Sequence, residues 1–255
     1  LFFTATLFLI PAVIVFAAID EPPSKLREQR GAFRDHLRRG MDTLREDRNF
    51  RLLVATRLLM AAAMAGQVIF IPYAIKGLAL PESIVGVLMI IAACFALPSN
   101  FLWSHLCDRY GNRRLLQVVS CVFLCSPLYA IASSYAPEYR PDLPLPAGYD
   151  LKALLFVVAF ILGAIATKGG FMGTTNYLLE IAPEDRRPSY MAFMRVLQAP
   201  TVLMPLIAGS IAELYSFQAA FAVAGAGGLG TLLLAYHLDE PRRIDRTAHP
   251  TDARR

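Results

Sequence analysis

The chain has 255 residues, of which 56% are hydrophobic and only 18% charged, and its mean hydropathy is +0.46. A chain this apolar cannot cover a water-facing surface, which excludes an ordinary soluble enzyme, a disordered or collagen-like chain and a small disulfide-stabilised protein. The composition indicates a polytopic membrane protein whose apolar side chains mostly face lipid.

Long stretches without charge predict the membrane spans. About 20 helical residues cross a hydrocarbon core roughly 30 Å thick. Five such stretches carry no charge, and two more carry a single basic residue, Lys168 or Arg195. The seven predicted helices lie within 1–19, 58–75, 83–104, 115–137, 153–179, 189–212 and 214–236. Their apolar runs are continuous, which favours helices over the alternating strands of a β-barrel. We therefore predict an all-α membrane protein, a helical bundle with seven transmembrane helices.

The distribution of Lys and Arg predicts the orientation. Most of them lie in one alternating set of connections, 20–51, 105–114, 180–188 and 239–255, whereas the opposite set holds only Lys76, Arg140 and Lys152. By the positive-inside rule the first set faces the cytoplasm, so the C-terminal tail is predicted to be cytoplasmic. The expected location is the plasma membrane, with a prokaryotic inner membrane favoured. This loop bias accounts for the net charge of +5 without a nucleic-acid partner.

The longest connection, residues 20–51, is strongly basic. Apolar residues recur along it at helical spacing, with Arg and acidic residues on the other faces: Leu26, Phe33, Leu37, Met41 and Leu44. This pattern predicts an amphipathic helix at the inner headgroup surface. The alternative is a plain solvated linker.

Lys168 stands near the middle of a predicted span, where a cation costs about 2.5–3.5 kcal/mol on insertion scales. Gly163, Gly169, Gly170 and Gly173 surround it and permit close helix approach or local unwinding, and Thr174 follows. One interpretation places Lys168 in a central cavity, where it meets an anionic or carbonyl group of a solute. In the other interpretation, backbone carbonyls or a neighbouring carboxylate satisfy the Lys168 ammonium group.

Three amides stand close to the middle of spans or beside prolines. Gln67 is central in its span, Asn100 follows Pro98, and Gln198 precedes Pro200 and Pro205. Together with Lys168 and Thr174, they are the candidate substrate-binding residues. Interhelical hydrogen bonds use the same residue types, which is the alternative.

Arg57 and Arg195 lie within about two turns of the predicted cytoplasmic ends of their spans. A guanidinium can snorkel to the interface from there, or the two can form a cytoplasmic gate by pairing with acids. Since no Asp or Glu lies near a span centre, the sequence offers no titrating carboxylate there. No nucleotide-binding loop and no metal cluster is visible, and no cofactor is expected.

One predicted inner loop, Ser104-His105-Leu106-Cys107-Asp108-Arg109-Tyr110-Gly111-Asn112-Arg113-Arg114, resembles the G-x-L-a-D-R-x-G-R-K loop motif of the major facilitator superfamily. Gly111 permits a tight turn, Asp108 can bond helix N-terminal amides, and Arg109 and Arg113 can anchor to the membrane face. The sequence departs from the motif at Ser104, which replaces Gly, and at Asn112, which replaces a basic residue. A second element, Glu180-x-x-Pro183-x-x-x-Arg187, resembles the family's loop between its tenth and eleventh helices.

The resemblance covers nearly the whole chain. Residues 1–19 resemble the sixth helix of the family, 20–51 the central loop and 52–238 helices seven to twelve, with a tail at 239–255. It implies the C-terminal half of a twelve-helix secondary transporter, with six helices forming one bundle. The missing partner is then an N-terminal six-helix bundle, which Asp108 and Arg109 would contact. The loop-motif residues Asp108, Arg109, Gly111, Arg113, Glu180 and Arg187, together with Arg57 and Arg195 from their place in the spans, are the candidate gating residues.

The expected function is transport of a small solute, which an anionic group would suit, by alternating access in the lipid bilayer. A transporter-like receptor or assembly factor without flux is the alternative. A membrane-embedded enzyme is disfavoured, because the chain has no H-E-x-x-H or G-x-S-x-G motif and no nucleophile or metal cluster at membrane depth.

Overall fold

A computed structural model describes residues 10–11, 13–15, 17, 33–137, 139 and 150–240, and no strand occurs among these residues. Six helical segments are long and apolar enough to cross a membrane: Arg48–Gly77, Ile84–Tyr110, Asn112–Tyr135, Leu151–Ile181, Arg187–Leu214 and Phe217–His237. The all-helical architecture agrees with the sequence prediction. The remaining predicted span, residues 1–19, lies largely outside the described residues.

The chain divides into two compact units, Leu1–His36 and Leu37–Arg255. In the first unit, the described residues between 10 and 17 are helical, and α2 (Phe33–Glu46) begins near its end. The second unit holds the rest of α2 and the six long segments. Within it, Gly40 of α2 is buried against the ring of Phe193, and Leu44 packs against the core. Residues 20–32 of the predicted amphipathic helix lie outside the described part of the chain.

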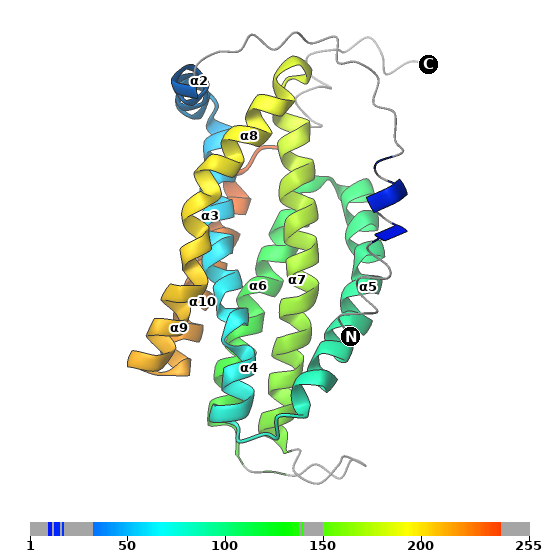
Figure 1. Ribbon diagram of the computed structural model, residues 1–255, viewed down its shortest axis with the longest axis vertical. Coiled ribbons are helices and arrows are strands. Elements are labelled where there is room, and N and C mark those ends of the chain that lie inside the picture. Colours follow the sequence, from blue (N-terminus) through cyan, green and yellow to red (C-terminus); the bar gives the residue numbers. More distant parts are fainter. Residues whose placement is uncertain are drawn as a thin grey trace. The chain divides into compact units, whose positions relative to one another are not determined.

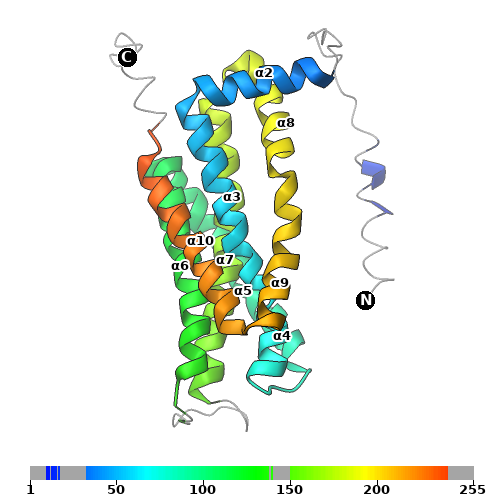
Figure 2. The ribbon, with the colours of Figure 1, turned by 90° about the vertical axis from the view of Figure 1, so that its left-hand side faces the viewer.

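The second unit is a helical bundle (Figure 1). Its elements are α3 (Arg48–Val68), α4 (Phe70–Pro72), η1 (Tyr73–Gly77), α5 (Ile84–Tyr110), α6 (Asn112–Tyr135), α7 (Leu151–Ile181), η2 (Glu184–Arg186), α8 (Arg187–Gln198), η3 (Ala199–Leu203), α9 (Met204–Leu214) and α10 (Phe217–His237). Helix α7 packs against α5 and α6, and α10 packs against α3 and α6. The segment α8–η3–α9 follows α3 along its length (Figure 2).

Side-chain caps mark where three of these helices begin. The carboxylate of Asp47 accepts a hydrogen bond from the backbone N–H of Phe50 at 2.9 Å. Asp150 does the same for Ala153 at 3.0 Å, and the hydroxyl of Ser216 accepts from the N–H of Ala219 at 3.1 Å. Each cap satisfies a backbone donor that the first turn of a helix leaves without a partner.

Aromatic clusters occupy the two ends of the Arg48–Gly77 segment, which comprises α3, α4 and η1. At one end the ring of Phe50 packs edge-on against Tyr190, with 4.9 Å between the ring centroids. At the other end Tyr73 packs against Phe221 at 5.1 Å and donates or accepts hydrogen bonds with Ser133 and Ser134. Both clusters join this segment to helices distant in sequence, so they fix its position in the bundle.

Prolines interrupt two of the long segments. The α-helix α3 ends at Val68, four residues before Pro72. Proline has no N–H to donate to the carbonyl four residues earlier, and its ring clashes with that carbonyl. Pro200 and Pro205 flank the transition from α8 through the tighter turns of η3 into α9. By contrast, α5 remains helical through Pro98.

Glycines let the helices approach closely. A Cβ added at Gly169 would lie 2.5 Å from a Val119 methyl and 2.8 Å from the Trp103 ring. The indole of Trp103 donates to the carbonyl of Ile165 at 3.0 Å, which joins α5 to α7. Because α7 is helical from Leu151 to Ile181, its glycines serve close packing and not local unwinding.

Candidate functional site

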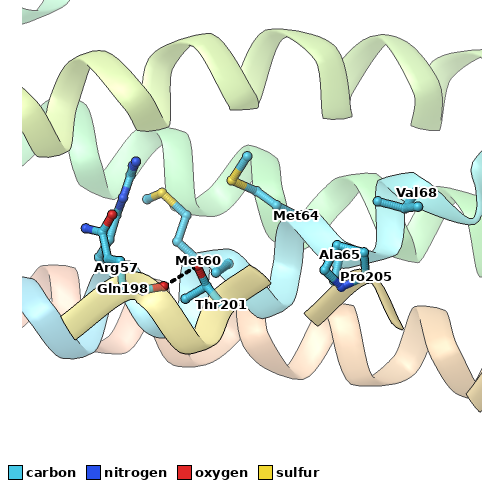
Figure 3. Close-up of a pocket in the computed structure, with 9 residues that line it drawn as sticks. Arg57, Met60, Met64, Ala65, Val68, Gln198, Thr201 and Pro205 are labelled. Atoms are coloured by element: carbon cyan, nitrogen blue, oxygen red, sulfur yellow. Dashed lines mark hydrogen bonds between the residues drawn. The ribbon is translucent and has the colours of Figure 1, made fainter. Parts of the chain in front are cut away.

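A cavity of about 290 Å³ lies between α3 and the α8–η3–α9 segment. Its lining is mostly apolar, with a few polar groups, which is typical of small-molecule sites. The lining residues are Arg57, Met60, Ala61, Met64, Ala65, Val68, Gln198, Thr201 and Pro205. Figure 3 shows Arg57, Met60 and Gln198 close together at one end of this cavity, with Val68 at the other.

A second, smaller cavity of about 30 Å³ adjoins the first, since Arg57 and Gln198 line both. Helix α7 contributes Thr174, Thr175 and Leu178 to it, and α8 contributes Met191, Met194 and Arg195. The two cavities therefore bring residues of α3, α7 and α8 to one place. Three predicted site residues besides Arg57 meet here: Thr174, Arg195 and Gln198.

Arg57 is half-buried and reaches from α3 to α7. Its Nη1 donates a hydrogen bond to Thr174 Oγ1 at 2.7 Å and a longer one to the carbonyl of Gly170 at 3.4 Å. Its guanidinium also lies over the ring of Phe171, 5.9 Å from the centroid. These contacts hold the guanidinium of Arg57 against α7. Among the described residues no acidic side chain pairs with it.

The amide of Gln198 faces both cavities from the end of α8. The adjoining turn is held by Thr201, whose hydroxyl donates to the backbone carbonyl of Gln198 at 2.7 Å (Figure 3). In the described part of the chain, no hydrogen bond occupies the Gln198 side chain. It is therefore available to a bound molecule.

The other candidate binding residues line neither cavity. Lys168 is exposed on α7 and Asn100 is exposed on α5. Gln67 accepts a hydrogen bond from the hydroxyl of Thr167 at 3.0 Å, while its buried Nε2 has no partner among the described residues. Gln67 thus joins α3 to α7, as the interhelical alternative foresaw for this residue type.

The first loop motif forms the turn between α5 and α6. Gly111 adopts φ +86° and ψ 166°, a conformation that residues with a side chain rarely adopt. Asp108 and Arg109 are exposed next to this turn, and Arg109 lies over the ring of Tyr110. Arg113 donates to the carbonyl of Tyr236 at 2.8 Å, which ties the loop to the end of α10.

The departure from the motif at position 112 has a local structural role. Asn112 is buried, and its carbonyl oxygen accepts a hydrogen bond from the thiol of Cys107 at 2.9 Å. Cys107 in turn lies 3.9 Å from the amide nitrogen of Asn176 on α7. A basic side chain would not fit this buried thiol–amide cluster without an anionic partner.

Replacing Gly111 with alanine should destabilise the protein. The backbone conformation at Gly111 costs a residue with a Cβ roughly 1–3 kcal/mol, and the new methyl group would also collide with the Glu240 carboxylate. Thermal unfolding of the purified protein in detergent measures the loss. Gly86→Ala is the matched control, because a Cβ at Gly86 meets nothing within 4 Å. An equal melting temperature for both variants would contradict the role assigned to Gly111.

The second loop motif lies between α7 and α8. Arg187 pairs with Glu184 at 3.6 Å, and both side chains are exposed. Glu180 lies near the end of α7, three residues before Pro183, where the chain leaves the helix. An exposed ion pair of this kind contributes little to stability.

The sequence reasoning missed all four methionines and two threonines that line a cavity: Met60, Met64, Met191, Met194, Thr175 and Thr201. From sequence alone, a methionine that lines a cavity cannot be told from one that faces lipid or lies in the core. Thr201, by contrast, stands three residues after Gln198 beside Pro200, and that spacing carried a usable signal.

Comparison with known proteins gives two findings. The profile of the Major Facilitator Superfamily matches the chain in two overlapping stretches, residues 1–139 and 53–254. The chain is also 25% identical over 188 residues to "Sugar efflux transporter A" of Dickeya chrysanthemi. That alignment covers 72% of this chain and 43% of the relative, so the chain spans less than half the length of this relative.

Proposed function

This chain belongs to the Major Facilitator Superfamily, and from that premise we propose that it forms one six-helix bundle of a transporter that moves a small polar solute by alternating access. In such a transporter two bundles rock about a binding site between them, so that the site opens to each side of the membrane in turn. The second bundle is the proposed partner of the bundle described here.

The observation that carries this proposal is the set of polar groups exposed within membrane-length helices. Lys168 and Arg195 are both exposed, on α7 and α8, and Arg57 and Gln198 line the adjoining cavities. Facing lipid, Lys168 near the centre of its span would cost about 2.5–3.5 kcal/mol on insertion scales. This face of the bundle therefore suits a water-filled cavity between two bundles better than contact with lipid.

A different face of the bundle offers the contrast. The exposed residues on the middle and far half of α10 are Ala226, Leu229, Leu233, Tyr236 and the terminal His237, and none of them is a Lys, Arg, Asp or Glu. That surface suits lipid. The separation of polar and apolar exposed faces supports a bundle with one side toward a solute pathway and another toward the bilayer.

The proposed solute is a sugar or a similarly sized polar molecule. The relative's printed name describes sugar efflux, and a cavity of about 290 Å³ is just below the roughly 300–1,000 Å³ typical of small-molecule sites. Arg57, Gln198 and Thr201 offer donors and acceptors for hydroxyl groups, while the methionines offer apolar contact. Lys168 and Asn100 are proposed to complete the site from the exposed face.

We place the end of the bundle that carries Arg48 and the loop of Gly111 in the cytoplasm, following the positive-inside rule. On this orientation the loops at 105–114 and 180–188 lie where the two bundles meet when the inner side closes. Asp108, Arg109 and Arg187 are exposed there and are proposed to contact the second bundle.

Solute counterflow in proteoliposomes tests the proposal. The intact protein, as its cell makes it, is reconstituted with a high internal concentration of an unlabelled hexose or disaccharide, and a trace of the labelled sugar is added outside. A carrier with alternating access accumulates the label transiently, whatever its coupling ion or direction. We expect this transient accumulation of the labelled sugar. Binding of the sugar without counterflow would favour the receptor alternative and contradict transport.

A further inference from the structure

We propose that the site at the junction of the two cavities binds an anionic oxygen group, a carboxylate or a phosphate, carried by the transported solute and held between Arg57 and Arg195. This inference deepens the proposed function and rests on it. On this inference the preferred solute is an acidic or phosphorylated sugar and not a neutral one.

The two arginines converge from different helices. Arg57 comes from α3 and Arg195 from α8, and both line the smaller cavity. No Asp or Glu lines either cavity. Two cations at a partly desolvated site repel each other, and no described acidic residue there offsets the repulsion. An anion bound between them would turn the repulsion into two attractive interactions.

Both guanidinium groups carry N–H donors that no described residue engages. A guanidinium carries five N–H groups, and within the described residues only Nη1 of Arg57 is engaged, by Thr174 and Gly170. The other nitrogens of Arg57 are not sealed from solvent, and Arg195 is exposed. Planar guanidinium groups match the oxygens of a carboxylate or phosphate in a two-pronged arrangement. Thr174 thus positions Arg57 with part of its fork toward the cavity.

The two cavities would hold different parts of the solute. The smaller one, about 30 Å³, has room for a group of a few atoms beside the arginines and Thr175. The larger one, about 290 Å³, runs away from Arg57 past Met60 and Met64 toward Val68 (Figure 3). A charged group would lie in the first and an uncharged ring in the second, with Gln198 contacting both.

Calorimetric titration of the intact protein in phosphatidylcholine bilayers tests this assignment with three probes: a hexose, the corresponding hexuronate and the hexose 6-phosphate. We expect an anionic probe to bind about 10- to 100-fold more tightly than the hexose, as charge-assisted hydrogen bonds would give. In Arg195→Gln this ratio of dissociation constants should fall to about one. Arg48→Gln is the control and should keep the ratio, because Arg48 is an exposed residue paired with Asp239 at 3.3 Å.

Several outcomes would overturn the inference: equal or tighter binding of the neutral hexose, no binding of either anion, or a preference that survives Arg195→Gln. Repeating the titration in bilayers that contain phosphatidylglycerol distinguishes the source of the anion. Unchanged affinity supports a solute anion, whereas loss of anion binding assigns the site to a lipid headgroup and contradicts the proposal. Counterflow of neutral hexose together with absent anion binding would refute this inference alone. Absence of counterflow for all three probes would refute the proposed function.

Discussion

Replacing Arg57 with alanine should reduce solute counterflow by the intact protein by roughly 100-fold while the bundle stays folded. Arg57 lines both cavities and is held across α3 and α7 by its 2.7 Å hydrogen bond to Thr174. The substitution removes a charged donor from the site, and hydrogen bonds to charged groups contribute about 1.5–3 kcal/mol each. Initial rates of counterflow in proteoliposomes measure the loss.

Two further variants separate binding from folding. Arg57→Lys keeps the charge but loses the planar fork, so we expect an intermediate rate. Thr174 can still donate its own hydroxyl to the Gly170 carbonyl at 2.7 Å when Arg57 is gone, so α7 keeps this local bond and the melting temperature should change little. Counterflow of Arg57→Ala at the parental rate would remove Arg57 from the solute pathway.

Replacing Gly227 with leucine should prevent the bundle from folding. A Cβ at Gly227 would lie 2.9 Å from the backbone nitrogen of Ala63 and 3.0 Å from the carbonyl oxygen of Leu59. These are backbone atoms of α3, so no side-chain rotation relieves the clash and α10 must move away. Overpacking costs about 1–3 kcal/mol for modest insertions and more for a whole side chain against backbone. Size-exclusion chromatography in detergent measures the yield of monodisperse protein.

Gly209→Leu is the matched control for this prediction. Gly209 also lies in a helix, α9, but a Cβ there meets nothing within 4 Å. Leucine is also a better helix former than glycine, so the substitution at this open position favours the helix by up to about 1 kcal/mol. Normal yield and stability of Gly227→Leu would show that α3 and α10 do not pack as described.

The long helices could be predicted from the sequence because a membrane span imposes a simple constraint on composition. The uncharged stretches 83–104 and 115–137 overlap α5 (Ile84–Tyr110) and α6 (Asn112–Tyr135) almost completely. Helix limits were less predictable. The predicted span 153–179 corresponds to α7, Leu151–Ile181, which is two residues longer at each end and begins at the N-cap Asp150.

The composition of the site was only partly predictable. Arg57 and Thr174 are 117 residues apart in the chain, and nothing in either local sequence indicates that they bond. The helices α5, α7 and α10 are apolar around most of their circumference, so no amphipathic pattern tells which face is inward. The sequence singles out Lys168 as a cation within a predicted span, but its exposure on α7 and its absence from the lining of the two cavities emerge only from the packing.

The measurement that tests the account most directly is the water accessibility of position 168. In a background without Cys94, Cys107, Cys121 and Cys125, Lys168→Cys is exposed to a membrane-impermeant maleimide in right-side-out and inside-out vesicles that contain the intact protein. Leu229→Cys, on the uncharged exposed face of α10, is the control. We predict labelling of Lys168→Cys from at least one side and none of Leu229→Cys. Equal resistance of both positions would place Lys168 against lipid or sealed protein and contradict a solute pathway along α7.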